Sequence, residues 1–370
     1  MGIDLLDFDE TDNKEVDKPD FGKAQLLEAL TQITEITELK ELRNRIANIS
    51  FNIKKYSNIF LREDTNKAPA FGLNTETVLK DLEQILETYS LERSQYYVKR
   101  LLKALTTKKS SKINDLDLNR WKEYQDIVTD SLWIVEKRDR SGAHNAGYWG
   151  NFIPQIPQQL MKRYTKRGEW VLDTFVGSGT TLIECKRLGR NGIGIDLSKD
   201  ALNTTNDNLG KEENKFAVKT ELFNADSTAL DYKQMLNQIG TKSVQLVIMH
   251  PPYWDIIKFS ENEKDLSNAN DEKSFLEGIR AVGKKSYEIL DRGRYLAIVI
   301  GDKYSRGEWI PLGFESMNEL RNVGFKLKSV VVKNFDVTKG KRNQEDLWRY
   351  RALVGGFYVF KHEYIFIFQR

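Results

Sequence analysis

The sequence predicts an α/β protein in which a doubly wound, mainly parallel sheet with a terminal antiparallel hairpin follows an N-terminal helical region. Leucine and isoleucine recur at steps of three and four residues in the first third of the chain, as on one face of a helix. From residue 170 onward, short apolar strands alternate with helix-sized segments. The last two apolar segments, 328–332 and 363–368, have no helix-sized apolar pattern between them, which suits an antiparallel pair.

Composition excludes several classes of protein. The 370 residues are 40% hydrophobic and 30% charged, enough apolar material to bury a full core. The single cysteine, Cys185, rules out an intramolecular disulfide and a cysteine-cluster metal site, and with three histidines we expect no metal centre. No apolar run approaches the roughly 18–20 residues of a membrane helix. The acidic N-terminus is unlike a secretory signal, so we expect a cytoplasmic protein without a membrane partner.

Charge is unevenly distributed along the chain. Residues 1–20 contain eight acidic residues and two lysines, a balance of −6, whereas the whole chain carries +3, which leaves +9 for the remainder. With little apolar surface to bury, residues 1–20 are expected to form an acidic flexible tail. The basic remainder permits a polyanionic partner.

Residues 21–137 are predicted to form the helical region. Apolar residues repeat at helical spacing up to about residue 64, and a second helix is expected from Thr75, where Thr-Glu-Thr suits a helix N-terminus. Further helical material around residues 97–105 ends in a polar linker.

Residues 138–370 are predicted to form the α/β domain. The expected strands are 170–173, 191–196, 244–249 and 295–300, with a helix at 180–188 after the first of them. We expect Cys185 on that helix to face the sheet, and assign His144 a structural role.

A glycine turn connects the first strand to its helix. Gly177 and Gly179 let the backbone approach a ligand closely, and the helix N-terminus offers unpaired N–H groups. Asp173 at the strand end could hold a cationic amino group. The third glycine of the dinucleotide fingerprint and the lysine of a phosphate loop are both absent, which favours a ligand that carries an amino acid. The alternative is a simple tight turn.

Two further carboxylates follow predicted strands. Asp196 ends the second strand, about twenty residues after the glycine turn, where a carboxylate can accept both hydroxyls of a ribose. Its alternative role is to cap the next helix. Asp226 lies where a third strand should end and could accept from an adenine amino group, or belong to a surface turn.

The segment His250-Pro251-Pro252-Tyr253 is the strongest signal in the chain. Two prolines after a buried strand fix an extended backbone and remove two N–H donors, so carbonyls at the strand's carboxyl end stay free. Tyr253 and Trp254 add flat aromatic faces.

Together these motifs resemble the S-adenosylmethionine-dependent DNA amino-methyltransferases of restriction–modification systems, which modify N6 of adenine or N4 of cytosine. The resemblance covers roughly residues 144–370 and includes Phe152-Ile-Pro-Gln-Ile-Pro157, Gly301-Asp302 and the closing strand. It implies a Rossmann-like methyltransferase fold with S-adenosyl-L-methionine as cofactor. The cofactor would be lined by these residues: Phe152, Pro154, Asp173, Phe175, Gly177, Gly179, Thr180, Asp196 and Asp226.

The resemblance also assigns catalysis to His250, Pro251, Pro252 and Tyr253. Two acceptors on the hydrogens of an exocyclic base amine, the side chain of His250 and the carbonyl of Pro251, would favour its pyramidal, nucleophilic form. The methyl group would pass directly to a base flipped out of duplex DNA, with Tyr253 stacked against the base. Trp254 would add a wall to the base pocket, or belong to the core.

His250 departs from the family, which has aspartate, asparagine or serine there. Only neutral histidine can accept a hydrogen bond, so we expect activity to fall as the pH drops through the His250 pKa. A flat rate profile between about pH 5 and 8 would then remove His250 from the acceptor role. The choice between adenine and cytosine stays open.

Only 71 residues separate Gly179 from His250, too few for a separate recognition domain between them. The part that recognises the DNA sequence must therefore lie in the N-terminal helices or in the C-terminal loops. The interstrand segment 339–351 holds five cations, which could contact DNA or form a solvated loop: Lys339, Lys341, Arg342, Arg349 and Arg351.

Three other functions remain open. Similar motifs occur in RNA base-amine methyltransferases and in protein-glutamine methyltransferases, although the latter have asparagine before Pro-Pro-Tyr. A non-catalytic nucleic-acid-binding partner with this fold would bind S-adenosylmethionine without methyl transfer. A cognate restriction endonuclease would be a partner of the DNA enzyme.

Overall fold

Apolar side chains on one face of each N-terminal helix form a core of their own. The computed structural model describes residues 22–55, 74–145, 147–335 and 344–370. The chain divides into two units, Met1–Lys109 with Asp117–Tyr124, and Ser110–Leu116 with Gln125–Arg370. The described helices of the first unit are α1 (Lys23–Ile33), α2 (Leu39–Lys55), α4 (Thr75–Leu86), α5 (Leu91–Thr106) and the short η1 (Leu118–Glu123).

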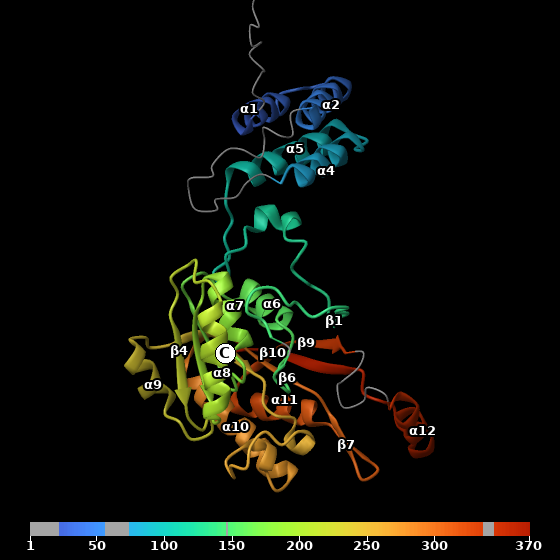
Figure 1. Ribbon diagram of the computed structural model, residues 1–370. Helices are drawn as coiled ribbons and strands as arrows, with labels where there is room; N and C mark the ends of the chain where they lie inside the picture. Colours follow the sequence, from blue (N-terminus) through green and yellow to red (C-terminus); the bar gives the residue numbers. More distant parts are fainter. Residues whose placement is uncertain (1–21, 56–73, 146, 336–343) are drawn as a thin grey trace, which may run out of the picture. The chain divides into compact units, whose positions relative to one another are not determined.

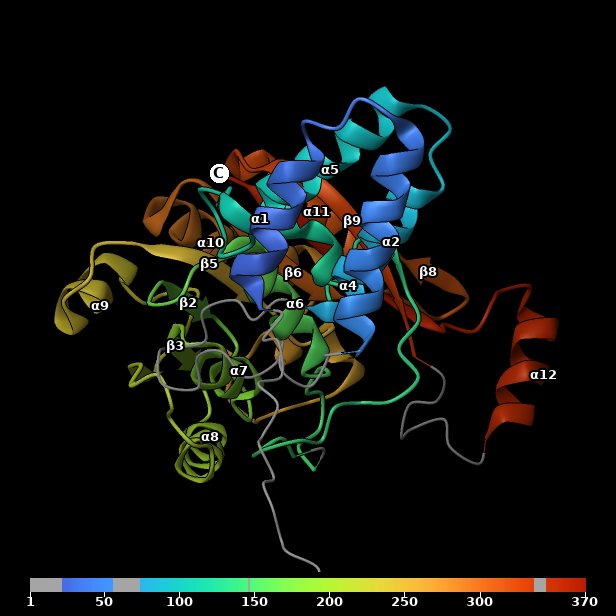
Figure 2. The same ribbon diagram turned by 90° about the horizontal axis from the view of Figure 1, so that it is seen from above.

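The helices α1, α2, α4 and α5 lie side by side, as Figure 2 shows, because their apolar faces pack together. Leu30, Leu42 and Leu82 are fully buried at the centre of this packing. Asn74 and Ser90 cap α4 and α5 through their side chains, which satisfies N–H groups that a helix start leaves unpaired. The predicted helical periodicity and the start at Thr75 are both confirmed.

The second unit is built on one eight-stranded sheet, shown in Figure 1. Its strands run in the order β1–β9–β10–β6–β5–β2–β3–β4, and β10 alone is antiparallel to its neighbours. The bounds are β1 (Leu132–Trp133), β2 (Trp170–Asp173), β3 (Asn191–Asp196), β4 (Thr220–Asn224), β5 (Val244–Met249), β6 (Leu290–Ile300), β9 (Lys326–Asn334) and β10 (His362–Gln369). A separate hairpin pairs β7 (Lys303–Ser305) with β8 (Glu308–Ile310).

Helices cover both faces of the sheet, as a doubly wound fold requires. One face packs against α6 (Gln155–Tyr164) and α7 (Thr180–Leu188), and α7 packs in turn on α8 (Lys199–Lys211). The other face packs against α9 (Tyr232–Ile239), α10 (Glu272–Ile289) and α11 (Leu312–Val323). Alternate residues of β2 illustrate the two faces: Val171 lies in the first core and Leu172 in the second.

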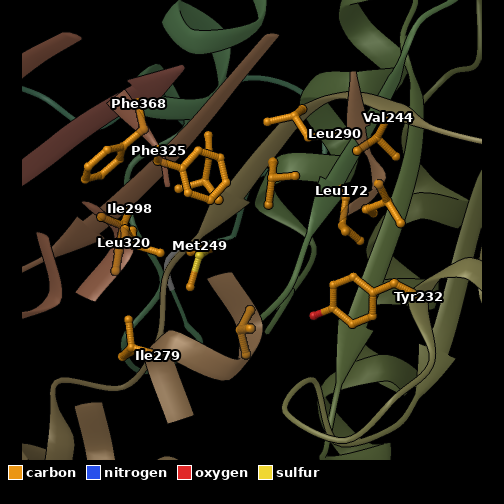
Figure 3. Close-up of a cluster of buried hydrophobic side chains, with 14 of the residues drawn as sticks. Leu172, Tyr232, Val244, Met249, Ile279, Leu290, Ile298, Leu320, Phe325 and Phe368 are labelled. Atoms are coloured by element: carbon orange, nitrogen blue, oxygen red, sulfur yellow. The ribbon is translucent and has the colours of Figure 1, made fainter. Parts of the chain in front are cut away.

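The larger core lies under α9, α10 and α11 (Figure 3). Leu172, Met249 and Ile298 come from three neighbouring strands and meet Ile279 of α10 and Leu320 of α11 there. Within the described residues, none of the helices is long and apolar enough to cross a membrane.

The sequence predicted most of this sheet. The strands 170–173, 191–196 and 244–249 and the helix 180–188 have the predicted bounds, whereas β6 begins earlier, at Leu290. The antiparallel pair of β9 and β10 is confirmed. Cys185 is fully buried against the sheet, and burial raises the pKa of its thiol well above the usual range.

Three features differ from the expectation. Residues 132–133 form β1 on the edge of the sheet, inside the range 21–137 that was expected to be helical. Residues 345–351, expected in an interstrand loop, lie in α12 (Glu345–Gly355), a helix with no buried residue. The pattern concealed α12 because a helix that buries no face needs no apolar periodicity. The expected acidic tail, residues 1–20, lies outside the described residues.

Candidate active site

The glycine turn and the Pro-Pro-Tyr segment follow neighbouring strands. β2 pairs with β5, and Asp173 stands opposite Ile248, so the chain beyond each strand emerges at the same edge of the sheet. β3 is the other neighbour of β2, which brings Asp196 to this edge as well. The carboxyl ends of parallel strands are where open α/β sheets bind their ligands. We call this place the site edge.

Positive φ angles at both glycines shape the turn between β2 and α7. Gly177 has φ +53° and Gly179 has φ +86°, values that favour glycine. A Cβ atom on Gly179 would lie 2.7 Å from the Thr205 methyl group. The side chains of Thr205 and Asn208, on α8, donate hydrogen bonds to the carbonyls of Gly177 (2.7 Å) and Ser178 (2.9 Å). Helix α8 therefore fixes the carbonyl side of the turn.

Asp173 lies beneath the turn and is 1% exposed. One carboxylate oxygen accepts from the Phe175 amide (3.0 Å) and the other from the Thr181 hydroxyl. Burial raises the pKa of Asp173 to about 6, against the lowering effect of these two bonds. Both oxygens of Asp173 thus stabilise the glycine turn and the start of α7. The sequence suggested that Asp173 holds the cationic amino group of a ligand.

Asp196 binds the same turn from β3. Its Oδ2 accepts from the Gly177 amide (2.8 Å) and its Oδ1 from the Ser198 amide (2.9 Å). Burial raises its pKa, and the hydrogen bonds from the Ser198 and Gly177 amides lower it. A carboxylate offers about four acceptor positions, so the hydrogen bonds from the Ser198, Gly177 and Leu197 amides leave one free.

Asp226 follows β4 directly after Ala225 and is half-buried. Its Oδ1 accepts from both the amide and the hydroxyl of Thr228 (2.8 and 2.7 Å), which makes an Asx turn. One residue that the sequence did not point to, Tyr148, also belongs to the site. The ring of Tyr148 lies against Gly177, and burial together with the charges of Asp196 and Asp265 raises the Tyr148 pKa to about 12. The sequence feature that could have pointed to Tyr148 is the aromatic pair Tyr148-Trp149 between two glycines.

His250 is held between two aromatic rings. The ring centroid of Phe152 lies 4.7 Å from that of His250, and the Tyr253 ring meets His250 edge-on at 5.7 Å. Asn151, next to Phe152, donates a hydrogen bond to Ser178 Oγ (3.1 Å) in the glycine turn. Residues 151–152 therefore connect the two strand ends.

Burial determines the charge of His250. It lowers the pKa of His250 to about 4, with a smaller raising effect from Glu363 and a further lowering effect from Lys333. The imidazole is consequently neutral at pH 5–8 and can accept a hydrogen bond. The expectation that a flat profile over pH 5–8 would exclude an acceptor role is wrong, because this histidine titrates below that window.

The remaining residues of the segment are also fixed. Pro251 is buried, and within the described residues its carbonyl accepts no hydrogen bond. The Tyr253 ring lies against Gly301, where a Cβ atom would come within 3.0 Å of the ring. Trp254 has φ +50°, a strained conformation for a bulky residue, and its indole N–H donates to the Ala269 carbonyl (2.8 Å). Lys303 lies over its ring at 4.0 Å, so Trp254 is packed from two sides.

The other predicted residues lie around this centre. Pro154 is buried at the start of α6, Phe175 is partly buried against the larger core, and Thr180 is the first residue of α7. Arg349 and Arg351 are exposed on α12, with Arg351 5.2 Å from the Trp348 ring. Lys339, Lys341 and Arg342 lie outside the described residues. His144 is buried and bonds Glu184 (2.7 Å), which agrees with a structural role.

The arrangement can hold an S-adenosylmethionine-type ligand. Asp196 has an acceptor position to spare, and within the described residues the amides of Ser178 and Thr180 have no hydrogen-bond partner. The strands β4–β3–β2–β5–β6 have the order of a nucleotide-binding doubly wound sheet, and the antiparallel β10 beside β6 makes the fold that of a Rossmann-like methyltransferase. Proteins of this class take S-adenosyl-L-methionine as methyl donor.

Comparison with known proteins finds relatives for part of the chain. A family model described as DNA methylase matches residues 30–207. The Type II methyltransferase M.MjaII of Methanocaldococcus jannaschii is 31% identical over 163 residues, 35% of this chain and 31% of that protein. The Type II methyltransferase M2.DpnII of Streptococcus pneumoniae is 40% identical over 101 residues, 26% of this chain and 34% of that protein. Over the matched segments the chain is therefore similar to DNA methylases and to Type II methyltransferases.

These matches are partial in length. The chain spans about a third of the length of the curated relatives it matches. Among solved structures, TrmN from Thermus thermophilus aligns with 60% of this chain and 50% of its own, at 15% identity and a TM-score of 0.38.

Proposed function

We propose that this protein transfers a methyl group from S-adenosyl-L-methionine to an exocyclic amine, N6 of adenine or N4 of cytosine, in a base flipped out of double-stranded DNA. The observation that carries the proposal is the pair of acceptors after β5, the neutral imidazole of His250 and the free carbonyl of Pro251. They stand beside an aromatic ring and next to the glycine turn.

The cofactor would be held by the glycine turn. Asp196 would accept a ribose hydroxyl and Asp226 the adenine amino group, while Gly177, Gly179 and Thr180 admit the ligand to the N-terminus of α7. Phe152, Pro154, Phe175 and the Tyr148 ring would enclose it. When bound, S-adenosylmethionine supplies a sulfonium methyl group that needs no further activation.

The target amine is a poor nucleophile because its lone pair is delocalised into the base. His250 and the Pro251 carbonyl would each accept one of its hydrogens, and so favour the pyramidal amine whose lone pair points at the methyl group. Pro252 keeps the backbone extended, and the Tyr253 ring would stack on the flipped base. Trp254, held by Lys303 and Ala269, would form a fixed wall of the pocket.

Cations near the end of β9 would bind the DNA backbone. Arg349 and Arg351 project from the exposed α12, and Lys339, Lys341 and Arg342 precede it in the sequence. Such contacts position a duplex without reading its bases. The names of the relatives support a role in a restriction–modification system, with a restriction endonuclease as partner.

Methyl transfer from labelled cofactor to separate pools of duplex DNA, single-stranded DNA and RNA tests the function, with digestion to identify the modified nucleoside. We expect N6-methyladenosine or N4-methylcytidine as the deoxynucleoside, from duplex DNA only. The His250→Ala variant should lose at least about 100-fold in kcat, the usual effect of removing one transition-state hydrogen-bonding group. Modified RNA would instead identify an RNA enzyme, and cofactor binding without transfer to any pool would identify a non-catalytic partner.

The matched control is His362→Ala. His362 lies at the start of β10 and bonds the Tyr364 hydroxyl (3.0 Å). Its removal should change kcat by less than about twofold, because its ring lies outside the acceptor pair.

A further inference from the structure

A buried ion pair stands behind the Pro-Pro-Tyr segment. Lys333 of β9 and Glu363 of β10 are direct cross-strand partners, and their charged groups approach to 2.9 Å. Lys333 is 5% exposed and Glu363 is 9% exposed. Burying two charges is costly, and such a pair often adds no net stability over an apolar pair. Its presence at the site edge therefore invites a functional explanation.

The ion pair continues into the site through Tyr253. Glu363 uses Oε1 for Lys333 and Oε2 to accept the hydrogen bond from the Tyr253 hydroxyl (2.9 Å). Burial and the neighbouring Glu363 raise the pKa of Tyr253 well above its usual range, which keeps the phenol protonated. The single phenolic proton is thus committed to Glu363, and the Tyr253 oxygen can only accept from any other neighbour.

That other neighbour is His250. Its Nε2 lies 3.3 Å from the Tyr253 oxygen. Because this oxygen can only accept, Nε2 must carry the imidazole proton. Neutral imidazole has one proton, so Nδ1 carries the lone pair. Within the described residues Nδ1 has no hydrogen-bond partner. Nor is it one of the buried side-chain nitrogen and oxygen atoms that lack a partner, so it is not sealed from solvent.

We propose that Lys333, Glu363 and the Tyr253 hydroxyl hold His250 in the Nε2–H tautomer, and so reserve its Nδ1 lone pair for a hydrogen of the target amine. The inference rests on the proposed function and deepens it, since it explains how a histidine can stand where the family has aspartate, asparagine or serine. Those side chains always present an oxygen acceptor, whereas a histidine presents an acceptor only in the correct tautomer. Lys333 and Glu363 are positioning residues, because they act through Tyr253.

The tautomer can be measured directly in the free protein. Two-bond ¹H–¹⁵N correlation spectra of protein labelled with ¹⁵N-histidine distinguish protonated from unprotonated ring nitrogens, and the His250→Asn variant identifies the His250 signals among the three histidines. We expect Nε2 protonated and Nδ1 unprotonated. Tyr253→Phe, and the paired variant Lys333→Met with Glu363→Leu, should both lose this preference. A proton on Nδ1, or an unchanged preference in both variants, would overturn the proposal.

Kinetics separate this role from a structural one. Tyr253→Phe removes one hydrogen bond, so it should lower kcat about tenfold. It keeps the ring for stacking, so KM for DNA should stay within about twofold of the wild-type value. In the His250→Asn background, Tyr253→Phe should lower kcat by less than about twofold, because the oxygen of an amide accepts a hydrogen bond without any choice of tautomer. Equal losses in both backgrounds would contradict the proposal.

Tyr364→Phe is the matched control. It removes one buried phenolic hydroxyl from β10, at the residue next to Glu363. The partners of this hydroxyl are His362 and Asp302, and His250 is not among them. We expect an unchanged His250 spectrum and an unchanged kcat. The spectra need no turnover, so an inactive wild-type protein would refute the proposed function and leave the tautomer result standing.

Discussion

His250 illustrates how position alone sets the chemistry of a side chain. In water, histidine titrates near neutral pH, but burial between Phe152 and Tyr253 removes the solvent that would stabilise its positive charge. The facing charges of Glu363 and Lys333 act in opposite directions on its pKa and so partly cancel. The imidazole is thereby neutral, and able to accept a hydrogen bond, from pH 5 to 8.

The pH dependence of kcat tests this assignment at the residue scale. The pKa of His250 is lowered to about 4, so the acceptor is intact above that value and is lost as the pH falls through it. The ratio of wild-type kcat to that of His250→Asn should therefore be constant from pH 8 to 5 and fall below pH 5. Single-turnover methylation at each pH gives the ratio.

His250→Asn is also the control for other groups that titrate. Asp173, with a pKa raised to about 6, titrates equally in both proteins and cancels in the ratio. Circular dichroism at each pH should show that both proteins remain folded. A ratio that falls with a midpoint between pH 6 and 7 would contradict a His250 that stays neutral down to pH 5.

At the scale of elements, the glycine turn depends on the helix packed behind it. Thr205 and Asn208 of α8 hold the two carbonyls of the turn, while Asp196 holds the Gly177 amide. The turn is therefore fixed by β3 and α8 as well as by its own glycines. Within the described residues, this arrangement leaves the amides of Ser178 and Thr180 at the start of α7 without a hydrogen-bond partner.

Gly179→Ala tests the turn as an element. It adds a Cβ atom 2.7 Å from the Thr205 methyl group at a residue with φ +86°. We expect a loss of about 1–3 kcal/mol in the free energy of unfolding, from backbone strain and the displaced Thr205. The affinity for S-adenosylmethionine should fall at least about tenfold, since that displacement disturbs the turn. Urea unfolding and calorimetric titration measure the two effects.

Gly240→Ala is the matched control for that variant. Gly240 ends α9 with φ +78°, and no atom lies within 4 Å of its added Cβ. Gly240→Ala introduces the same backbone strain without the steric contact, so it should lower the free energy of unfolding by about 1–2 kcal/mol. Cofactor affinity should be unchanged. Equal affinities for the two glycine variants would show that the turn tolerates the displacement of Thr205.

At the scale of the whole molecule, the direction of the strands decides which cations lie at the site edge. β9 ends and β10 begins at the site edge, because Lys333 and Glu363 pair there, and α12 is inserted between these two strands. Lys242 precedes β5 and Arg292 lies near the start of β6, which places both at the opposite edge of the sheet. Cations at the two edges should therefore contribute differently to DNA binding.

The salt dependence of DNA binding tests this asymmetry. Arg349→Gln with Arg351→Gln should weaken binding and reduce the slope of log affinity against log salt by up to about 2, one unit for each lost phosphate contact. Lys242→Gln with Arg292→Gln makes the same change in charge and should leave the slope unaltered. Fluorescence anisotropy with a labelled duplex at several salt concentrations gives both slopes. Equal effects of the two pairs would show that only net charge matters.

The sequence determined most of the strands of the second unit, the helix 180–188 and the residues at their ends. A strand buried on both faces must be a short apolar run, and a tight turn into a helix must be rich in glycine. Gly177, Gly179, Asp196 and the segment from His250 to Tyr253 could all be found in this way. The helix α12 could not, because it buries no face. The roles of Thr205 and Asn208 were hidden as well, since polar residues on a helix give no sign of what they bond.

Only the tertiary structure decided the protonation of the site. The pKa of His250 depends on how completely other segments cover it, and its tautomer depends on Glu363, a residue 110 positions from Tyr253 in the chain. Lys333 and Glu363 meet because β10 enters the sheet between β6 and β9 in one register. Local patterns carry the periodicity of strands and helices, whereas long-range pairing alone sets burial, charge partners and the direction of each hydrogen bond.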